Sequence, residues 1–214
     1  MQYKAVIFDL DGVLVFTDKY HYLAWKALAD RLGIEFTEKD NDRLRGVSRE
    51  ESLEIILEKY HGEPISEDKK KEYLVEKNEI YKDSLGDMTR DDVTEKVRQT
   101  LSKIREAGYR LAIGSSSKNT SYILERVELT NAFDEVADGT MITRSKPDPE
   151  VFLKAAQLLK ENPSDCLVVE DADAGITAAH AAGMDAVAIG AATVSGRADY
   201  NISSFDELLG ILHA

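Results

Sequence analysis

The sequence has one cysteine, Cys166, and no long apolar run among its 214 residues. A single cysteine excludes an intramolecular disulfide and is typical of the reducing cytosol, so we expect a cytoplasmic protein. Without a run of roughly 18 apolar residues, no membrane-spanning helix is predicted. The first residues also lack the basic segment and apolar stretch of a secretory signal, so we expect no export.

Basic residues are scarce relative to acidic ones. The 27 lysines and arginines are outnumbered by 40 aspartates and glutamates, which gives a formal net charge of −13. Such a surface repels phosphate backbones and anionic lipids at long range, so we expect neither nucleic acid nor a membrane as a partner. A small anionic ligand needs a place where positive charge is gathered locally.

Apolar residues make up 43% of the chain, enough for a buried core in one large domain or two small ones. Continuous apolar runs, typical of strands covered on both faces, are found at 5–8, 110–114, 166–170 and 185–190. Helical periodicity appears just before the second run, at 91–107, and between the second and third runs, at 119–129 and 149–159. Strands that alternate with helices predict an α/β fold, with a Rossmann-like core built on a parallel sheet.

The long segment between the first two strands has helical patterns throughout. Residues 21–33 carry apolar side chains at helical spacing and end at a glycine. Residues 48–62 begin with Ser48 three positions before Glu51, as in a capping box, and a third helix is predicted over 66–85. Because such helices must bury their apolar faces against one another, we predict an inserted helical domain at 17–86 and a core domain formed by 1–16 and 87–214.

Acidic side chains follow two of the predicted strands, where ligands bind in open parallel sheets. Asp9 and Asp11 follow the first strand, and Glu170 and Asp171 end the third. Taken singly, each acid is most simply a turn former or a helix cap. Carboxylates about 4 Å apart repel by about 4 kcal/mol per pair at an effective dielectric of about 20, so a shared crevice requires a cation. Clustered carboxylates favour Mg²⁺.

Other groups near these strand ends suit a phosphoryl group. Ser115 offers a hydroxyl and backbone N–H groups, and Lys146 offers a compact positive charge in a loop that prolines hold extended. Lys118 and Asn119 open a helix, whose N-terminus favours anions. The simpler interpretations are capping serines and a solvated lysine. A carboxylate beside Mg²⁺ can attack phosphorus and form an aspartyl-phosphate.

In this order, Asp9-Leu10-Asp11-Gly12-Val13, Ser115, Lys146 and Glu170-Asp171 resemble the four motifs of the haloacid dehalogenase-like superfamily. Helices inserted after the first strand match its helical-cap branch. The stretches YHYLAWKALA, RLRGVSREESL, SSSKN and SKPDPEVFL are similar to the β-phosphoglucomutase family. That family interconverts β-D-glucose 1-phosphate and glucose 6-phosphate through β-glucose 1,6-bisphosphate.

The resemblance implies a role for each matching residue. Asp9 would be the nucleophile and Asp11 the general acid/base, while Ser115 and Lys146 would hold the transferring phosphoryl group. Mg²⁺ would bind Asp9, the Asp11 backbone carbonyl, Glu170 and Asp171. Arg49 would bind the sugar's other phosphate with help from Ser117, Lys118 and Asn119. The implied substrate-binding residues are Thr17, His21, Trp25, Arg45, Gly46, Arg49, Lys77, Ser116, Ser117, Lys118 and Asn119, of which Thr17, His21 and Lys77 would couple cap closure to the placement of Asp11.

Some of these residues also have simpler interpretations or depart from the family pattern. Arg49 alone would be a surface charge paired with a nearby glutamate, although a mutase needs a second anion site that an arginine fork suits. Trp25 alone would be cap packing. Arg45 occupies a position where the family often has lysine, and Phe16 replaces an acid. Phe16 can pack across the hinge between the domains or line the sugar pocket.

Two other functions would use the same pocket. A Mg²⁺-dependent sugar-phosphate phosphatase would transfer the phosphoryl group to water, and only exclusion of water by the closed cap separates it from a mutase. A non-catalytic sugar-phosphate sensor would not need both Asp9 and Asp11. The sequence therefore predicts a β-phosphoglucomutase that uses Mg²⁺ on a small-molecule sugar phosphate, as a monomer by likeness to the family, with the phosphatase as the alternative.

Overall fold

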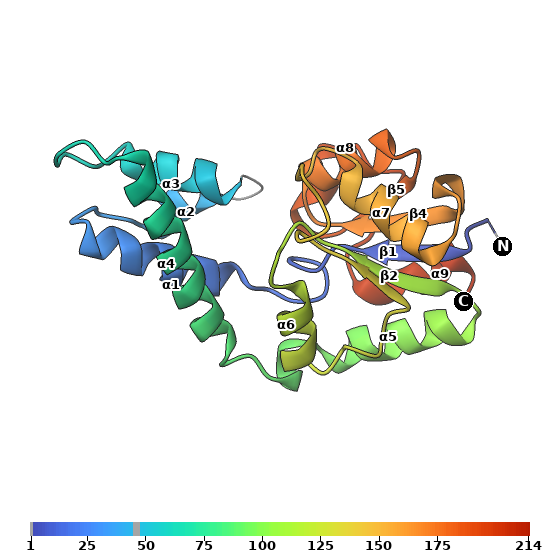
Figure 1. Cartoon of the computed structure of the whole chain (residues 1–214). Coiled ribbons are helices and arrows are strands. Elements are labelled where there is room, and N and C mark those ends of the chain that lie inside the picture. The colour runs from blue at the N-terminus through green and yellow to red at the C-terminus, as the bar shows by residue number, and fades with distance from the viewer. Residues whose placement is uncertain (1, 45–47) are drawn as a thin grey trace. The chain divides into compact units, whose positions relative to one another are not determined.

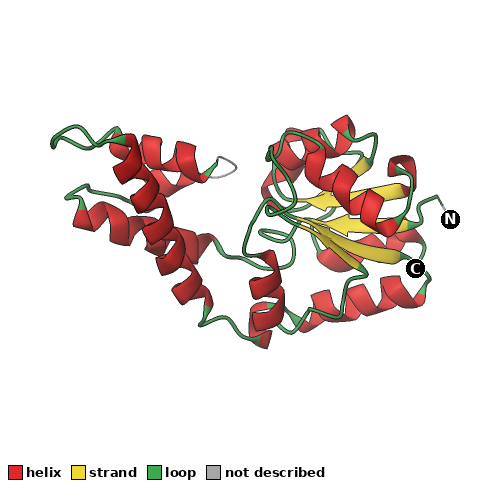
Figure 2. Ribbon diagram, viewed as in Figure 1, coloured by secondary structure: helices red, strands yellow, loops and turns green. Residues whose placement is uncertain are grey.

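The computed structural model describes residues 2–44 and 48–214. The chain divides into two compact units. We call Met1–Phe16 together with Met88–Ala214 the α/β unit, and Thr17–Asp87 the helical unit. Figure 1 colours the residues of the two units by their position in the chain. Figure 2 shows that the strands lie in the α/β unit and that the helical unit, over its described residues, consists of helices and loops.

The α/β unit is built on a parallel sheet, as the alternating pattern predicts, so the predicted fold class is confirmed. Among the described residues the sheet has six strands in the order β3-β2-β1-β4-β5-β6, all paired in parallel. The strands are β1 (Ala5–Phe8), β2 (Arg110–Gly114), β3 (Glu135–Ala137), β4 (Cys166–Glu170), β5 (Asp185–Ala188) and β6 (Tyr200–Asn201). The short strands β3 and β6 were not predicted.

Side-chain alternation divides the apolar residues of the strands between two layers of helices. Ala5 and Ile7 of β1 belong to a buried cluster with residues of α7 and α8, whereas Phe8 contacts Phe133 and Phe205. In Figure 1, α7 and α8 lie on one side of the sheet and α5 and α9 on the other. The bounds of these helices are α5 (Glu95–Glu106), α7 (Glu150–Leu159), α8 (Asp173–Ala181) and α9 (Leu208–Leu212).

Shorter helical elements complete the α/β unit. They are α6 (Thr120–Arg126) and the 3₁₀ helices η1 (Arg90–Asp92), η2 (Pro163–Asp165), η3 (Gly190–Ser195) and η4 (Phe205–Glu207). The prediction of one helix over 91–107 was wrong at its start. Thr94 caps α5 by accepting from the Val97 N–H, and Thr89 and Asp92 form a separate capping box around η1.

The helical unit contains α1 (Asp18–Arg31), α2 (Glu38–Asp42), α3 (Arg49–Leu57) and α4 (Glu67–Leu85). These helices share a buried apolar cluster that includes Leu28, Phe36 and Leu53. Ser48 caps α3 by accepting from the Glu51 N–H, as predicted. The predicted extension of this helix to residue 62 was wrong, because the Tyr60 N–H donates to the Leu57 carbonyl in a turn that ends it.

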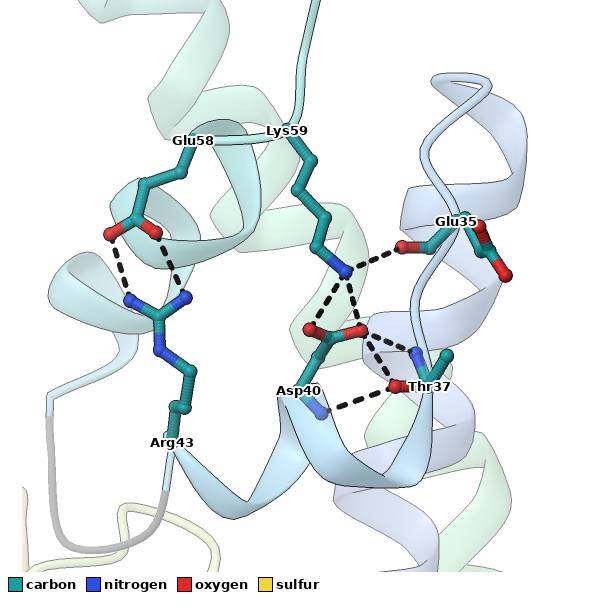
Figure 3. A network of polar contacts seen from close by, with 6 residues as sticks. All are labelled: Glu35, Thr37, Asp40, Arg43, Glu58 and Lys59. Atoms are coloured by element: carbon teal, nitrogen blue, oxygen red, sulfur yellow. Dashed lines mark hydrogen bonds and ion pairs between the residues drawn. The ribbon is translucent and has the colours of Figure 1, made fainter.

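Ion pairs hold α2 against the end of α3 (Figure 3). Arg43 donates to both carboxylate oxygens of Glu58, at 2.8 and 3.0 Å. Lys59 lies 2.7 Å from an Asp40 oxygen, and Asp40 also accepts from the backbone N–H of Thr37. This network therefore ties α2 and the residue after it to the two residues that follow α3. Nowhere in 2–44 or 48–214 does a helix have the length and apolar character required to cross a membrane.

Candidate active site

Three carboxylates meet at the carboxyl ends of the two central strands. Asp9 follows β1 and Glu170 ends β4, and the pairing of Phe8 with Val169 brings these two residues side by side. Oxygen atoms of Asp9, Glu170 and Asp171 lie within 4.8 Å of one another. Asp9 and Glu170 are buried. The structure thus brings together acids that are some 160 positions apart in the chain, as the sheet-edge argument predicts.

Lys146 enters this cluster from the segment between β3 and α7. Its Nζ donates to Asp9 Oδ1 and, at 2.6 Å, to Glu170 Oε1, and it lies 4.7 Å from the centre of the Phe152 ring. Burial alone lowers the pKa of Lys146, but the two carboxylates outweigh it, so this pKa is raised and the ammonium stays charged. Phe152 is a contact that the motif analysis missed, since only the tertiary structure brings its ring beneath the amine.

The pKa values of Asp9 and Asp171 are raised, which disfavours the fully ionised cluster. Burial raises the pKa of Asp9 well above its usual range; Lys146 opposes this shift, and the charges of Glu170 and Asp11 add to it. Burial and the charge of Glu170 raise the pKa of Asp171 to about 7. One lysine therefore neutralises three acids incompletely, and a bound cation would relieve the repulsion that remains.

The donor set fits a hard divalent cation. All three side chains offer carboxylate oxygens, the ligand type that Mg²⁺ and Ca²⁺ prefer. Gly12 keeps the space beside them open, because a Cβ at that position would lie 2.0 Å from Asp171 Oδ2. Gly12 also has a φ of +87°, a left-handed conformation that glycine adopts without strain. The local sequence thus leaves room for Asp171 while turning the chain after Asp11.

Asp11 lies in a tight turn, two residues after Asp9. The Gly12 N–H donates to the Val15 carbonyl at 2.7 Å, and the N–H groups of Leu14 and Val15 donate to the Leu10 carbonyl. The Asp11 side chain is partly exposed. Within the described part of the chain, this side chain is not one of the three that converge as a metal-binding group.

The serine loop follows β2, the strand beside β1. Ser115 is buried, and its N–H donates to the Ala137 carbonyl at 3.1 Å. The Ser117 N–H donates to Ser115 Oγ, and the Asn119 N–H donates to Ser117 Oγ. Ser116 Oγ is buried and has no hydrogen-bond partner within the described ranges. Lys118 is exposed, so the loop combines an ordered backbone with an accessible positive charge just before α6.

In the helical unit, the structure brings His21, Lys77 and Trp25 together. Lys77 Nζ lies 2.9 Å from His21 Nδ1 and close to the rings of Trp25 and Tyr81. Burial, followed by the charges of Lys77 and Arg49, holds the pKa of His21 well below its usual range. Tyr81, which stacks on His21, is four positions from Lys77, so helical spacing could have identified it.

The remaining predicted residues have varied surroundings. Trp25 is buried in the apolar cluster of the helical unit, as the packing interpretation expects, and its role in substrate binding stays a prediction. Thr17 is buried, and Arg49 is partly buried at the start of α3. Arg45 and Gly46 lie outside the described residues. Phe16 is 69% exposed and belongs to neither apolar cluster.

The sequence model of the haloacid dehalogenase-like hydrolases matches residues 3–183, and the chain belongs to this family. Within it, the chain is 39% identical to the β-phosphoglucomutase of Bacillus subtilis (strain 168) over 212 residues, which cover 98% of this chain and 94% of that protein. The resemblance that the motifs indicate is thereby confirmed.

Other relatives define the range of similarity. The crystal structure of β-phosphoglucomutase from Clostridium difficile superimposes with a TM-score of 0.86 at 36% identity, covering 96% of this chain and 93% of that one. A phosphorylated carbohydrates phosphatase of Thermotoga maritima is 30% identical, with 86% of this chain and 83% of that protein covered. Similarity is therefore greater to the two mutases than to this phosphatase.

Proposed function

We propose that this protein is a β-phosphoglucomutase that interconverts β-D-glucose 1-phosphate and glucose 6-phosphate through β-glucose 1,6-bisphosphate. The observation that carries the proposal is the likeness to a β-phosphoglucomutase over 98% of the chain. The convergence of Asp9, Lys146 and Glu170 supports it, because phosphoryl transfer through an aspartyl-phosphate needs a carboxylate nucleophile beside positive charge.

The proposal includes Mg²⁺ as the cofactor. Asp9, the backbone carbonyl of Asp11, Glu170 and Asp171 would hold it. When bound, Mg²⁺ neutralises negative charge on the oxygens of the transferring phosphoryl group. Lys146 and Ser115 add a second positive group and hydrogen-bond donors around the same oxygens.

Asp9 and Asp11 divide the chemistry between them. A carboxylate oxygen of Asp9 attacks a phosphorus atom of the β-glucose 1,6-bisphosphate primer, the bond from that phosphorus to the sugar oxygen breaks, and the released sugar monophosphate leaves an aspartyl-phosphate. The aspartyl-phosphate then passes its phosphoryl group to the O6 hydroxyl of β-glucose 1-phosphate, which frees the Asp9 carboxylate. Asp11 takes the proton of that hydroxyl. The bisphosphate then presents its other phosphate, Asp9 accepts it, and Asp11 returns the proton to the leaving O1, which yields glucose 6-phosphate.

A mutase must also hold the phosphate that is not reacting. We assign this task to Arg49 of the helical unit, which acts as the cap, together with Ser117, Lys118 and Asn119. Thr17, His21 and Lys77 would couple closure of the cap to the placement of Asp11. The contact between Lys77 and His21 supports this assignment, because it gives the cap an ordered polar cluster.

Arg49→Ala is expected to reduce mutase kcat/KM by roughly 10–100-fold, since charge-assisted hydrogen bonds to phosphate contribute about 1.5–3 kcal/mol. Hydrolysis of p-nitrophenyl phosphate, which has no second phosphate, should change far less. Lys71→Ala removes an equal charge from an exposed position of the same unit and should leave both rates unchanged. Equal losses of both activities in the Arg49 variant would count against a remote-phosphate role.

His21→Gln is expected to make the free energy of unfolding depend less steeply on pH below about 6.5. Because the pKa of His21 is lowered in the folded state, the unfolded chain takes up a proton first as pH falls below about 6.5, and stability is lost from there downward. The unaltered protein should therefore lose about 1.4 kcal/mol per pH unit more than the variant in urea unfolding. Exposed His61→Gln is the control and should keep the original slope. An unchanged slope in His21→Gln would refute the neutral, buried state of His21.

The activity itself is tested by phosphorus NMR. Purified protein, Mg²⁺ and a trace of β-glucose 1,6-bisphosphate should convert β-glucose 1-phosphate to glucose 6-phosphate, with little free phosphate. Without the primer, conversion should be slow, since Asp9 must first be phosphorylated. Release of inorganic phosphate at a comparable rate without isomer formation would instead establish the phosphatase.

The proposal also covers the setting of the reaction. The protein would act as a monomer in the cytoplasm on a small sugar phosphate, without nucleic acid. The net charge of −13 disfavours binding to nucleic acid. The buried, free thiol of Cys166 suits a reducing compartment.

A further inference from the structure

Gly175 is a glycine inside a helix, where the backbone does not call for one. It is the third residue of α8 and is buried. Unlike Gly12, it has no positive φ, so its conformation is open to any residue. Alanine would be a better helix former at this position. Another feature of the structure must therefore explain the missing side chain.

The side chain of Glu170 occupies the place that a side chain at 175 would need. A Cβ at Gly175 would lie 1.9 Å from both Cδ and Oε1 of Glu170, and 2.5 Å from its Cγ. Such approaches are far inside van der Waals contact. Glu170 is 1% exposed, so its carboxylate has little free space into which it could move.

The position of Glu170 is closely defined by hydrogen bonds. Oε2 accepts from the N–H groups of Asp171 and Ala172, at 2.9 and 3.0 Å, at the start of α8. Oε1 accepts from Lys146 Nζ at 2.6 Å. A shift away from residue 175 would break contacts on one or both oxygens. It would also change the distances that join Glu170 to Asp9 and Asp171.

We propose that Gly175 is a positioning residue for Glu170: its missing side chain is the space that lets this carboxylate reach Lys146, the two amides and the metal-binding cluster together. In this proposal Gly175 acts only through Glu170. Gly175→Ala displaces the Glu170 carboxylate and weakens binding of the divalent cation. The identity of that cation as Mg²⁺ rests on the proposed function, whereas the packing of Gly175 against Glu170 does not.

A double-mutant cycle in chelator tests the packing without any metal. Gly175→Ala should lower Tm in the natural background, because the methyl group and Glu170 compete for one space. In a Glu170→Ala background that competition is gone, so the same change should raise Tm by about 2 °C through helix propensity alone. The same change in Tm in both backgrounds would overturn the inference.

Gly210→Ala provides the matched control. Gly210 also lies in a helix without positive φ, and a Cβ there would meet no atom within 4 Å. This substitution should leave Tm unchanged or raise it in both backgrounds. A loss of stability equal to that of Gly175→Ala would overturn the assignment of the loss to Glu170.

Titration calorimetry with MgCl₂ tests the consequence for the site. Gly175→Ala should weaken Mg²⁺ binding by about 10–100-fold, the usual effect of disturbing a group that orients a ligand. Gly210→Ala should bind as the unaltered protein does. Unchanged affinity in Gly175→Ala would overturn the positioning role. Failure of the unaltered protein to bind Mg²⁺ would contradict the proposed cofactor, and the stability cycle would then decide the role of Gly175.

Discussion

Asp9→Asn is expected to abolish phosphoryl transfer, with kcat reduced by a factor on the order of 10⁴ or more. The amide has no charged oxygen to attack phosphorus, so no aspartyl-phosphate can form. Mg²⁺ binding should weaken only in part, because the amide oxygen, Glu170 and Asp171 remain as donors. Turnover is followed by phosphorus NMR, and the phosphoenzyme by intact-protein mass spectrometry after incubation with the bisphosphate.

The control for this variant is an equivalent change away from the site. Asp165→Asn removes a carboxylate that pairs with Lys4 at the surface, and it should keep normal turnover and normal phosphorylation. Normal turnover in Asp9→Asn would end the assignment of Asp9 as nucleophile. A phosphorylated protein without turnover would place the phosphoryl group on a different residue.

Lys146→Met is expected to have the largest effect on stability. Lys146 is the partner of both Asp9 and Glu170, and its side chain is 11% exposed. Removing one member of a buried charge network typically destabilises by about 3–5 kcal/mol, because the other charges stay buried without compensation. Methionine has a similar length and keeps contact with the Phe152 ring.

The loss should depend on metal. In chelator, the free energy of unfolding of Lys146→Met should fall by the full amount, whereas saturating Mg²⁺ should restore part of it by binding the folded state. Mutase turnover should still fall by about 100-fold or more, because one charge is missing around the transferring oxygens. Lys4→Met, at the exposed pair with Asp165, should leave unfolding and turnover unchanged. Equal stability of Lys146→Met and the unaltered protein in chelator would contradict the charge-balancing role of Lys146.

Apolar runs in the sequence predicted strands correctly where the strand is buried along most of its length. The long strands β1, β2, β4 and β5 are buried and apolar along most of their length, so their sequences identify them. By contrast, β3 and β6 have three and two residues and are only partly buried, so they have no clear pattern of their own. They become strands because β2 and β5 offer free edges beside them.

Helix ends were predicted less well, because they depend on contacts with other segments. The pattern over 48–62 allows a longer helix, but α3 ends at Leu57. The residues that follow, Glu58 and Lys59, form ion pairs with Arg43 and Asp40 of the neighbouring segment (Figure 3). No local rule predicts these ion pairs, since the partners are 15 and 19 positions away.

The sequence by itself determined which residues end the buried strands. Asp9 follows β1 and Glu170 ends β4, and strands alternating with helices predict a parallel sheet whose carboxyl ends share one edge. Only the tertiary structure decided that β4 pairs with β1, that Lys146 reaches both carboxylates, and that Glu170 fills the space left by Gly175. The physical reason is that strand order and side-chain packing are decided by contacts between distant segments, which local hydrophobic patterns do not encode.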